Sequence, residues 1–230
     1  MSLEVADVER WIRARLEPRA DPESAASQRA YMKSDLDFLG VASSDVRSVA
    51  KEFVAAQGGL EREHLRAIAL HAFAAPSWDR RSVAIAILER RAKLLRAEDL
   101  GWLIELVRIA HAWAHVDWLA TKVIPHALAH ADLGATLRAW ARDPDVWVRR
   151  TALLVQHDAL KNEGGDWPPW TEIAIPMLEE KDFWIRKALG WVMREVGKKR
   201  PGLVRAFLAE HGDRCSGLTK REASKYLGGS

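Results

Sequence analysis

The sequence has little that would place the chain in an oxidising compartment or in a membrane. It has one cysteine, Cys215, so no disulfide can form within the chain, and the cytoplasm is the simplest expected location. The first residues carry acids and lack the apolar segment of a secretory signal. The longest apolar runs fall short of the roughly 18–20 residues that span a bilayer. We therefore expect no membrane partner.

The chain also lacks a strong excess of either charge. Its formal net charge is +3 and its pI is near 9.1, which alone does not indicate a nucleic-acid partner. The excess is uneven, because Arg138 and the residues after it hold 17 Lys and Arg against 13 Asp and Glu. A polyanion should therefore prefer the C-terminal part of the chain.

The alternation of apolar and polar residues that is typical of strands is nearly absent. Apolar residues instead recur at helical spacing, and Pro and Gly fall mainly between the periodic segments. We expect an all-α chain of roughly twelve helices without a sheet. Residues 1–230 are read as a single domain, with 228–230 set aside as a possible tag remnant.

Several residues predict where helices begin. Asp143 is expected to cap a helix with Pro144 at its first position, and Asp182 is expected to cap another. Thr219, with Glu222 three residues later, has the spacing of a capping box.

Tryptophan recurs with a nearly constant period. It stands early in four similar segments, at Trp78, Trp113, Trp147 and Trp184, with spacings of 35, 34 and 37 residues. Such a period, with two helices in each unit, predicts an α-solenoid of HEAT-like repeats, curved with a concave basic face. The alternative is an irregular helical bundle in which this spacing arose by chance.

The helix expected after Asp182 has two distinct faces. Its core side takes Ile185, Ala188, Val192 and Val196. Beside it lies a tryptophan–cation stripe, which consists of Trp184, Lys187, Trp191 and Arg194. Cations between flat rings suit a nucleic-acid backbone. Alternatively, the indoles pack against a neighbouring helix while solvent surrounds the cations.

Two further features admit both a functional and a structural interpretation. Arg149 and Arg150 follow Trp147, and a guanidinium there could bind a phosphate through two hydrogen bonds. Alternatively, Arg150 pairs with Asp145 or Glu163. In the segment HAWAHVDW, Trp113 and Asp117 fall at the rim of the core line that Val116, Leu119 and Val123 form. That aspartate is either a capping or ion-paired residue, or a carboxylate held beside an indole to meet a cationic group.

Histidine pairs raise the question of a metal. His111 and His115, and likewise His126 and His130, have the i,i+4 spacing of metal ligands. The first pair lacks the glutamate of the metalloprotease motif, and the two pairs are far apart in the sequence. We expect no metal and no cofactor, and we expect Cys215 to be inert.

Three blocks of the sequence resemble a known family. The blocks YMKSDLDFLGV at Tyr31–Val41, FWIRKALGWVMRE at Phe183–Glu195 and LTKREASKYL near the C-terminus resemble the AlkD-type DNA alkylation repair glycosylases. The resemblance runs from about Tyr31 to Leu227. It implies a monomeric HEAT-like solenoid in the cytoplasm, on the bacterial nucleoid when bound to DNA. It also implies cleavage of the N-glycosidic bond of purines alkylated at N3 or N7 in double-stranded DNA, without deep base flipping.

The resemblance also assigns residues. By position, Asp117 matches the catalytic aspartate, and Trp113 and Trp191 match the tryptophans that face the sugar. Arg150 matches an arginine that contacts the DNA backbone. With the stripe cations and the N-terminal block, the predicted DNA-binding residues are Arg150, Arg149, Lys187, Arg194, Tyr31 and Lys33.

One departure from the family pattern affects this assignment. The family commonly has Trp and Asp where this chain has Ala112 and Ala114. Substrate range or activity could therefore differ. The alternatives are a non-catalytic DNA-binding or scaffold relative, a HEAT module that binds protein, and a glycosylase specialised for bulky alkyl adducts.

Overall fold

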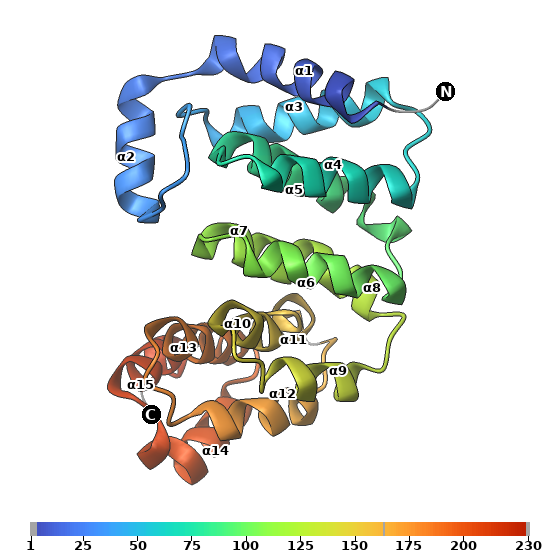
Figure 1. Ribbon diagram of the computed structural model, residues 1–230. Coiled ribbons are helices and arrows are strands. Elements are labelled where there is room, and N and C mark those ends of the chain that lie inside the picture. Colours follow the sequence, from blue (N-terminus) through green and yellow to red (C-terminus); the bar gives the residue numbers. More distant parts are fainter. Residues whose placement is uncertain (1–3, 163, 229–230) are drawn as a thin grey trace. The chain divides into compact units, whose positions relative to one another are not determined.

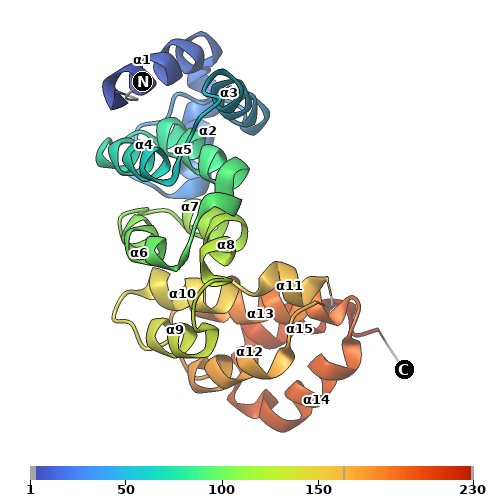
Figure 2. The same cartoon turned by 90° about the vertical axis from the view of Figure 1, so that its right-hand side faces the viewer.

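The chain is all-α, as its periodicity predicts. The computed structural model describes residues 4–162 and 164–228, and over these residues it has fifteen α-helices, more than the roughly twelve expected. Within the same residues, extended pairing is limited to one isolated bridge between Asp37 and Ser77. Contacts divide the chain into unit 1, up to His130, and unit 2, from Ala131 onward. Figures 1 and 2 show the helices of both units.

Unit 1 is built from paired helices that stack on one another. The pair α4–α5 is followed by α6 and the segment α7–α8, with α4 packed on α6 and α5 on α7. Figure 1 shows α2 running crosswise to α1 and α3, and α2 buries none of its residues. The helices are α1 (Val5–Leu16), α2 (Pro22–Met32), α3 (Ser43–Ala56), α4 (Arg62–Ala74), α5 (Trp78–Arg91), α6 (Leu100–Arg108), α7 (Trp113–Trp118) and α8 (Ile124–Leu128). Short helical turns are η1 (Glu17–Arg19), η2 (Ala92–Leu94), η3 (Ala97–Asp99) and η4 (Leu119–Val123).

Unit 2 repeats the same arrangement. Helix α9 packs on α12, while α10 packs on α13 and α13 on α15. The helices are α9 (Leu133–Trp140), α10 (Val146–Leu154), α11 (His157–Lys161), α12 (Trp167–Ala174), α13 (Phe183–Gly197), α14 (Pro201–His211) and α15 (Gly217–Ala223). Short turns are η5 (Ile175–Met177), η6 (Gly212–Arg214) and η7 (Ser224–Tyr226).

The tryptophan period marks equivalent places in these pairs. Trp78 and Trp113 are the first residues of α5 and α7, and Trp147 and Trp184 are the second residues of α10 and α13. Each lies within the first two residues of the second helix of its pair, which confirms the helical-repeat architecture within each unit. Their environments differ, because Trp78 is buried and the other three are half-buried.

One of the three predicted helix starts is confirmed. The Asp182 carboxylate accepts hydrogen bonds from the backbone N–H groups of Trp184 and Ile185. The assignment of Asp143 was wrong, because the chain turns once more and Asp145 caps α10 instead.

The capping box at Thr219 was also wrong. Ser216 is the N-cap residue of α15, and Thr219 lies inside the helix, where its hydroxyl donates to the Arg186 carbonyl. Glu222 reaches α13 instead of the start of its own helix. In both errors a second residue able to cap a helix lies two or three positions away, so the sequence alone does not determine which one is used.

Over the residues that the structure describes, none of the helices combines the length and apolar character needed to cross a membrane. Of residues 228–230, set aside above, only Gly228 falls within the described residues.

Candidate functional site

Asp117 and Trp113 lie one turn apart on α7, a helix of six residues. Trp113 is half-buried, at the rim of the core as the sequence predicts, whereas Asp117 is buried, with 9% of its surface exposed. The backbone carbonyl of Asp117 accepts a hydrogen bond of 2.8 Å from the Thr121 hydroxyl. The other predicted sugar-facing residue, Trp191, belongs to α13 in unit 2.

A π-helical turn begins two residues after Asp117. Leu119–Val123 forms this turn, η4, between α7 and α8. Pro125 follows closely, and because proline has no N–H it cannot continue a regular hydrogen-bond ladder. Single π-turns inside helices often occur at functional sites. The turn thus lies next to the segment that carries Asp117, the residue that the sequence singles out.

His115, between Trp113 and Asp117, is the buried centre of α7. It is 1% exposed, its Nε2 atom shares a hydrogen bond of 2.9 Å with the Ser82 hydroxyl, and its ring stacks on Trp78 at 3.9 Å. Burial, with a smaller effect from Arg81, lowers the pKa of His115 to about 3. The imidazole is therefore neutral at physiological pH and acts as an uncharged anchor for α7.

The same stack fixes the loop between α2 and α3. Phe38, in this loop, also stacks on the Trp78 ring, and the centroids of the two rings are 4.8 Å apart. The buried Asp79 carboxylate accepts hydrogen bonds from the backbone N–H groups of Leu39, at 2.7 Å, and Val41, at 3.2 Å. Burial raises the pKa of Asp79, although these two hydrogen bonds oppose the change.

The loop explains why the residues at 112 and 114 are small. Ala112 is 3% exposed and belongs to a buried cluster with Leu36 and Trp78, against which Ala114 and Phe38 pack. A tryptophan at 112 would need the volume that this cluster fills. Asp117 is the one carboxylate on α7.

The N-terminal candidates lie at the end of α2. Tyr31 is 69% exposed, and its ring meets the Trp113 ring edge-on, with centroids 5.8 Å apart. Lys33 is exposed and ends the helix in a left-handed conformation, with φ at 51°. The structure therefore brings Tyr31 to Trp113 within unit 1.

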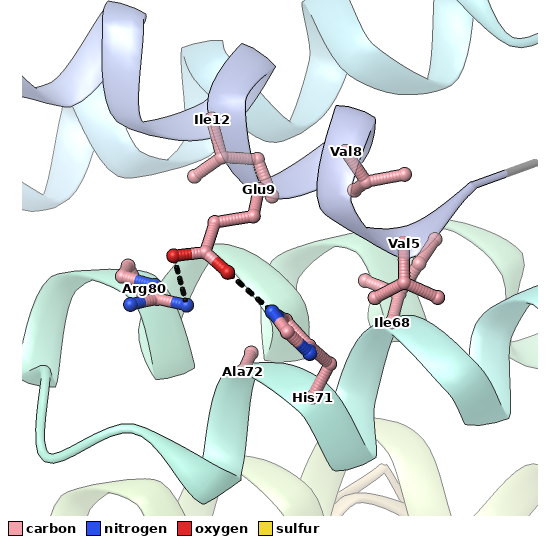
Figure 3. A pocket seen from close by; sticks show the side chains of 8 residues that line it. All are labelled: Val5, Val8, Glu9, Ile12, Ile68, His71, Ala72 and Arg80. Carbon is pink, nitrogen blue, oxygen red and sulfur yellow. Dashed lines mark hydrogen bonds and ion pairs between the residues drawn. The ribbon is translucent and has the colours of Figure 1, made fainter.

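A small pocket between α1, α4 and α5 has a structural role. Figure 3 shows Glu9 reaching from α1 to Arg80, at 2.8 Å, and to His71. The hydrogen bond from His71, helped by Arg80, holds the pKa of Glu9 below its usual value despite partial burial. The remaining lining is apolar, with Val5, Val8, Ile12, Ile68 and Ala72. These contacts tie α1 to α4 and α5.

The predicted faces of α13 in unit 2 are confirmed. Its core side, Ile185, Ala188, Val192 and Val196, is fully buried. All four residues of the tryptophan–cation stripe are half-buried beside it. The indoles contact neighbouring helices, because Trp184 lies 5.4 Å from the Trp147 ring and Trp191 lies 4.7 Å from the His157 ring.

The stripe cations share a partner that sequence spacing did not indicate. Lys187 and Arg194 both donate to the Glu222 carboxylate on α15. Burial opposes ionisation of Glu222, but the hydrogen bonds from Lys187 and Lys225 and the charge of Arg194 outweigh it and lower its pKa. The stripe is therefore held in place by a buried anion.

Arg149 and Arg150 bind other elements of unit 2. Arg149 donates two hydrogen bonds to the Glu180 carboxylate, at 3.0 and 3.1 Å. Arg150 is 2% exposed and donates to the Trp184 carbonyl at 2.5 Å, which ties α10 to α13. Glu163, a proposed partner of Arg150, lies outside the described residues. Phosphate contacts for both arginines remain predictions.

The histidine pairs and Cys215 were the candidates for metal binding and thiol chemistry. Among the described residues, no group of three or more His, Cys, Asp and Glu side chains is arranged to hold a metal. The Cys215 thiol is buried, and burial raises its pKa despite nearby Lys220 and Arg214. A thiol with a raised pKa is a poor nucleophile at neutral pH.

Comparison with known proteins identifies the family. The family model for DNA alkylation repair enzymes matches residues 12–227, nearly the whole chain. The chain belongs to the DNA alkylation repair enzyme family. A comparison with curated proteins found no match.

Solved structures of this repair family have the same fold. A predicted DNA alkylation repair enzyme from Enterococcus faecalis is 24% identical with a TM-score of 0.81, covering 92% of this chain and 98% of its own. AlkD2 from Streptococcus mutans is 16% identical with a TM-score of 0.61, covering 82% and 91%. Family membership makes this chain a DNA alkylation repair protein, with DNA as its partner.

Sequence reasoning missed three residues that support the candidate groups. His115 was considered only as a metal ligand, Ser82 was not considered, and Glu222 was assigned to a cap. A histidine among apolar residues at the centre of a short helix is a weak signal of burial. The partners that join them to other helices lie more than 25 residues away in the sequence, so spacing within one helix could not reveal them.

Proposed function

We propose that the chain is a DNA glycosylase that hydrolyses the N-glycosidic bond of cationic N3- or N7-alkylated purines in duplex DNA. Asp117 is the proposed catalytic residue, and Trp113 and Trp191 are its proposed partners at the deoxyribose. The observation that carries the proposal is a single buried carboxylate, Asp117, 9% exposed, on the same short helix as a half-buried indole.

The chemistry needs only one carboxylate. A purine alkylated at N3 or N7 is positively charged, so it leaves as a neutral base without protonation by a general acid, unlike the usual glycosidase leaving group. The electrons of the C1′–N bond depart with the purine, and the oxygen of a water molecule bonds to C1′. The proton released by that water passes to the Asp117 carboxylate and then to solvent, which leaves an abasic sugar.

Each residue has a defined task in this reaction. As the bond breaks, the sugar gains oxocarbenium character, which the negative charge of Asp117 stabilises while it orients the water. The electron-rich faces of Trp113 and Trp191 favour the same positive charge. In this mechanism the indoles stack on the sugar from a surface, and the base does not enter a deep pocket as it does in base-flipping enzymes. The choice of substrate then depends mainly on how easily the charged lesion leaves.

Substitution of Asp117 tests the proposal. Asp117→Asn removes the charge and keeps the size, so release of 7-methylguanine from methylated duplex DNA should fall about 100–1,000-fold, as when one preorganised stabilising group is deleted. Affinity for the duplex should change little. Asp35→Asn, at an exposed aspartate of the same unit, is the matched control and should release base normally. Unchanged release by Asp117→Asn would refute the assignment.

One observation favours a second candidate. Ala112 and Ala114 pack in a core cluster, so an indole and a carboxylate are missing from these two positions. This difference suits a relative that binds DNA without base excision, or a glycosylase specialised for bulky adducts. Base release from a panel of small and bulky N3 and N7 adducts separates them. Release of small adducts supports the first proposal, release of bulky adducts alone supports the specialised enzyme, and binding without release supports the non-catalytic relative.

A further inference from the structure

An ion-pair cluster joins α13 to α15 around one buried acid. Glu222, on α15, accepts hydrogen bonds from Lys187 at 3.0 Å, from Arg194, and from Lys225 at 3.2 Å. Gly190 permits this contact, because a Cβ atom there would lie 2.6 Å from the Cβ of Glu222. Three cations are thus gathered on one carboxylate.

A second buried acid extends the cluster along α13. Glu195 accepts from Lys198 at 2.8 Å and from Arg194 at 3.4 Å. Lys198 also lies over the ring of Tyr226, 4.8 Å from its centroid, and Tyr226 is 54% exposed. The contacts therefore run without interruption from Lys187 to an exposed aromatic ring in η7.

The acids lie beneath the cations. The side chains of Glu222 and Glu195 are 7% and 9% exposed, whereas those of the four cations are 21–49% exposed. Four positive charges against two negative charges leave a surplus of two, which faces solvent. The Glu222 cluster, as we name it, consists of Glu222, Glu195, Lys187, Arg194, Lys198 and Lys225.

We propose that the Glu222 cluster binds the phosphate backbone of DNA, so that the DNA-binding surface of unit 2 extends from the tryptophan–cation stripe to Lys198, Lys225 and Tyr226. The outward surplus of positive charge complements a row of phosphates, and an exposed tyrosine beside cations can donate to phosphate oxygens. The inference depends on DNA as the partner and not on base excision.

Buried acids prepare the cations for this task. Each ammonium or guanidinium is already held in place, so less side-chain freedom is lost when phosphates arrive. Exposed ion pairs alone would add little stability. The layered arrangement also explains why Lys225 matters although it lies outside α13, because Glu222 fixes it beside the same two stripe cations.

Binding of an undamaged, fluorescently labelled duplex to the full chain tests the proposal. Anisotropy titrations over a range of salt concentrations should show that Lys198→Ala and Lys225→Ala each bind several-fold more weakly. Each variant should also reduce the slope of log affinity against log salt by about 0.9, the value expected for one lost phosphate contact. Lys220→Ala, on α15 but outside the cluster, should match the wild type. Thermal melts check that each variant is folded, and Lys225→Met, which keeps the aliphatic stem, should show the same loss.

Two outcomes would overturn the inference. One is wild-type affinity and salt slope in both folded variants. The other is preferential binding of an acidic polypeptide, such as polyglutamate, over the duplex. Because the duplex is undamaged, these results are independent of base release by Asp117→Asn, so failure of the glycosylase proposal remains distinguishable.

Discussion

In unit 1, stacked rings hold the helix that carries Asp117, whereas in unit 2 ion pairs hold the helix that carries Trp191. The unit 1 anchor is neutral: His115 lies against Trp78 and shares a hydrogen bond with Ser82. The unit 2 anchor is charged, because the Glu222 carboxylate binds cations of α13.

This difference suits the proposed tasks. The stack positions α7 by packing, and because His115 is neutral it adds no charge of its own. A surface for phosphates needs cations, and buried acids beneath them limit their mutual repulsion and movement. Three kinds of experiment can therefore distinguish the two anchors. They create a cavity in the stack of unit 1, lower the pH, or add a methyl group where α13 and α15 approach closely.

Removal of the central ring should have the largest effect. Trp78→Ala leaves a cavity beside both Phe38 and His115, so we expect a loss of about 3–5 kcal/mol in the free energy of unfolding of unit 1. Hydrogen exchange should speed up in α5 and α7 while α13 and α15 keep their protection. Trp147→Ala, at a half-buried tryptophan of the repeat, should cost less. Equal losses from the two would show that the stack is not a special support.

Acid should distinguish the anchors next. Folded His115 has a pKa of about 3, compared with 6.5 when unperturbed, so its contribution is fully present above pH 6.5 and is lost as pH falls toward 3. The loss should be on the order of a few kcal/mol over that range. Urea unfolding at pH 7 and pH 5 should show a smaller difference in His115→Phe than in the wild type, whereas His130→Gln, at an exposed histidine, should leave it unchanged. An unaltered difference in His115→Phe would contradict the neutral anchor.

Unit 2 should respond at lower pH through its acids. The pKa values of Glu222 and Glu195 are lowered by their cations despite burial, so their contribution is lost only as pH falls below about 4.5. The pKa of buried His157 is also lowered, so unit 2 also loses stability when acid protonates this histidine. His157→Phe should therefore leave α13 and α15 protected from exchange at pH 5 and exposed at lower pH.

The smallest effect is expected from one added methyl group. In Gly190→Ala the new Cβ meets the Glu222 Cβ at 2.6 Å and the Thr219 carbonyl oxygen at 3.2 Å. Helix α15 must shift, at a cost of about 1–3 kcal/mol. Faster hydrogen exchange in α15 measures this shift. Gly202→Ala, where the added atom meets nothing within 4 Å, is the control and should not destabilise the fold. Wild-type exchange in Gly190→Ala would mean that the close approach is unimportant.

Local chemistry explains which features could be predicted from the sequence. The all-α class, the repeat and the faces of α13 follow from residue periods, and Asp182 was identified because no second capping residue competes with it nearby. The starts of α10 and α15 were misplaced because Asp145 and Ser216 are equally good caps. The period within one helix indicates which residues share a face, and it predicted the rim position of Trp113 correctly, whereas Asp117 is more buried than expected.

Partners far apart in the sequence could not be predicted in the same way. Glu222 and Lys187 are 35 residues apart, and Asp79 lies about 40 residues from the backbone groups it binds. The four periodic tryptophans look alike in sequence, yet only Trp78 is buried, because Phe38 and His115 reach it from elsewhere. Such outcomes depend on the tertiary arrangement of elements.

The π-turn beyond Asp117 has a consequence for how the chain can change during evolution. A π-turn widens the helix by about one residue compared with an α-helical turn, and each residue rotates the helix by about 100°. Loss of one residue from Leu119–Val123 would therefore rotate Asp117 away from its present direction if Ile124 and the residues after it kept their places. Individual side chains in this segment can be exchanged, but its length determines the direction in which the Asp117 carboxylate points.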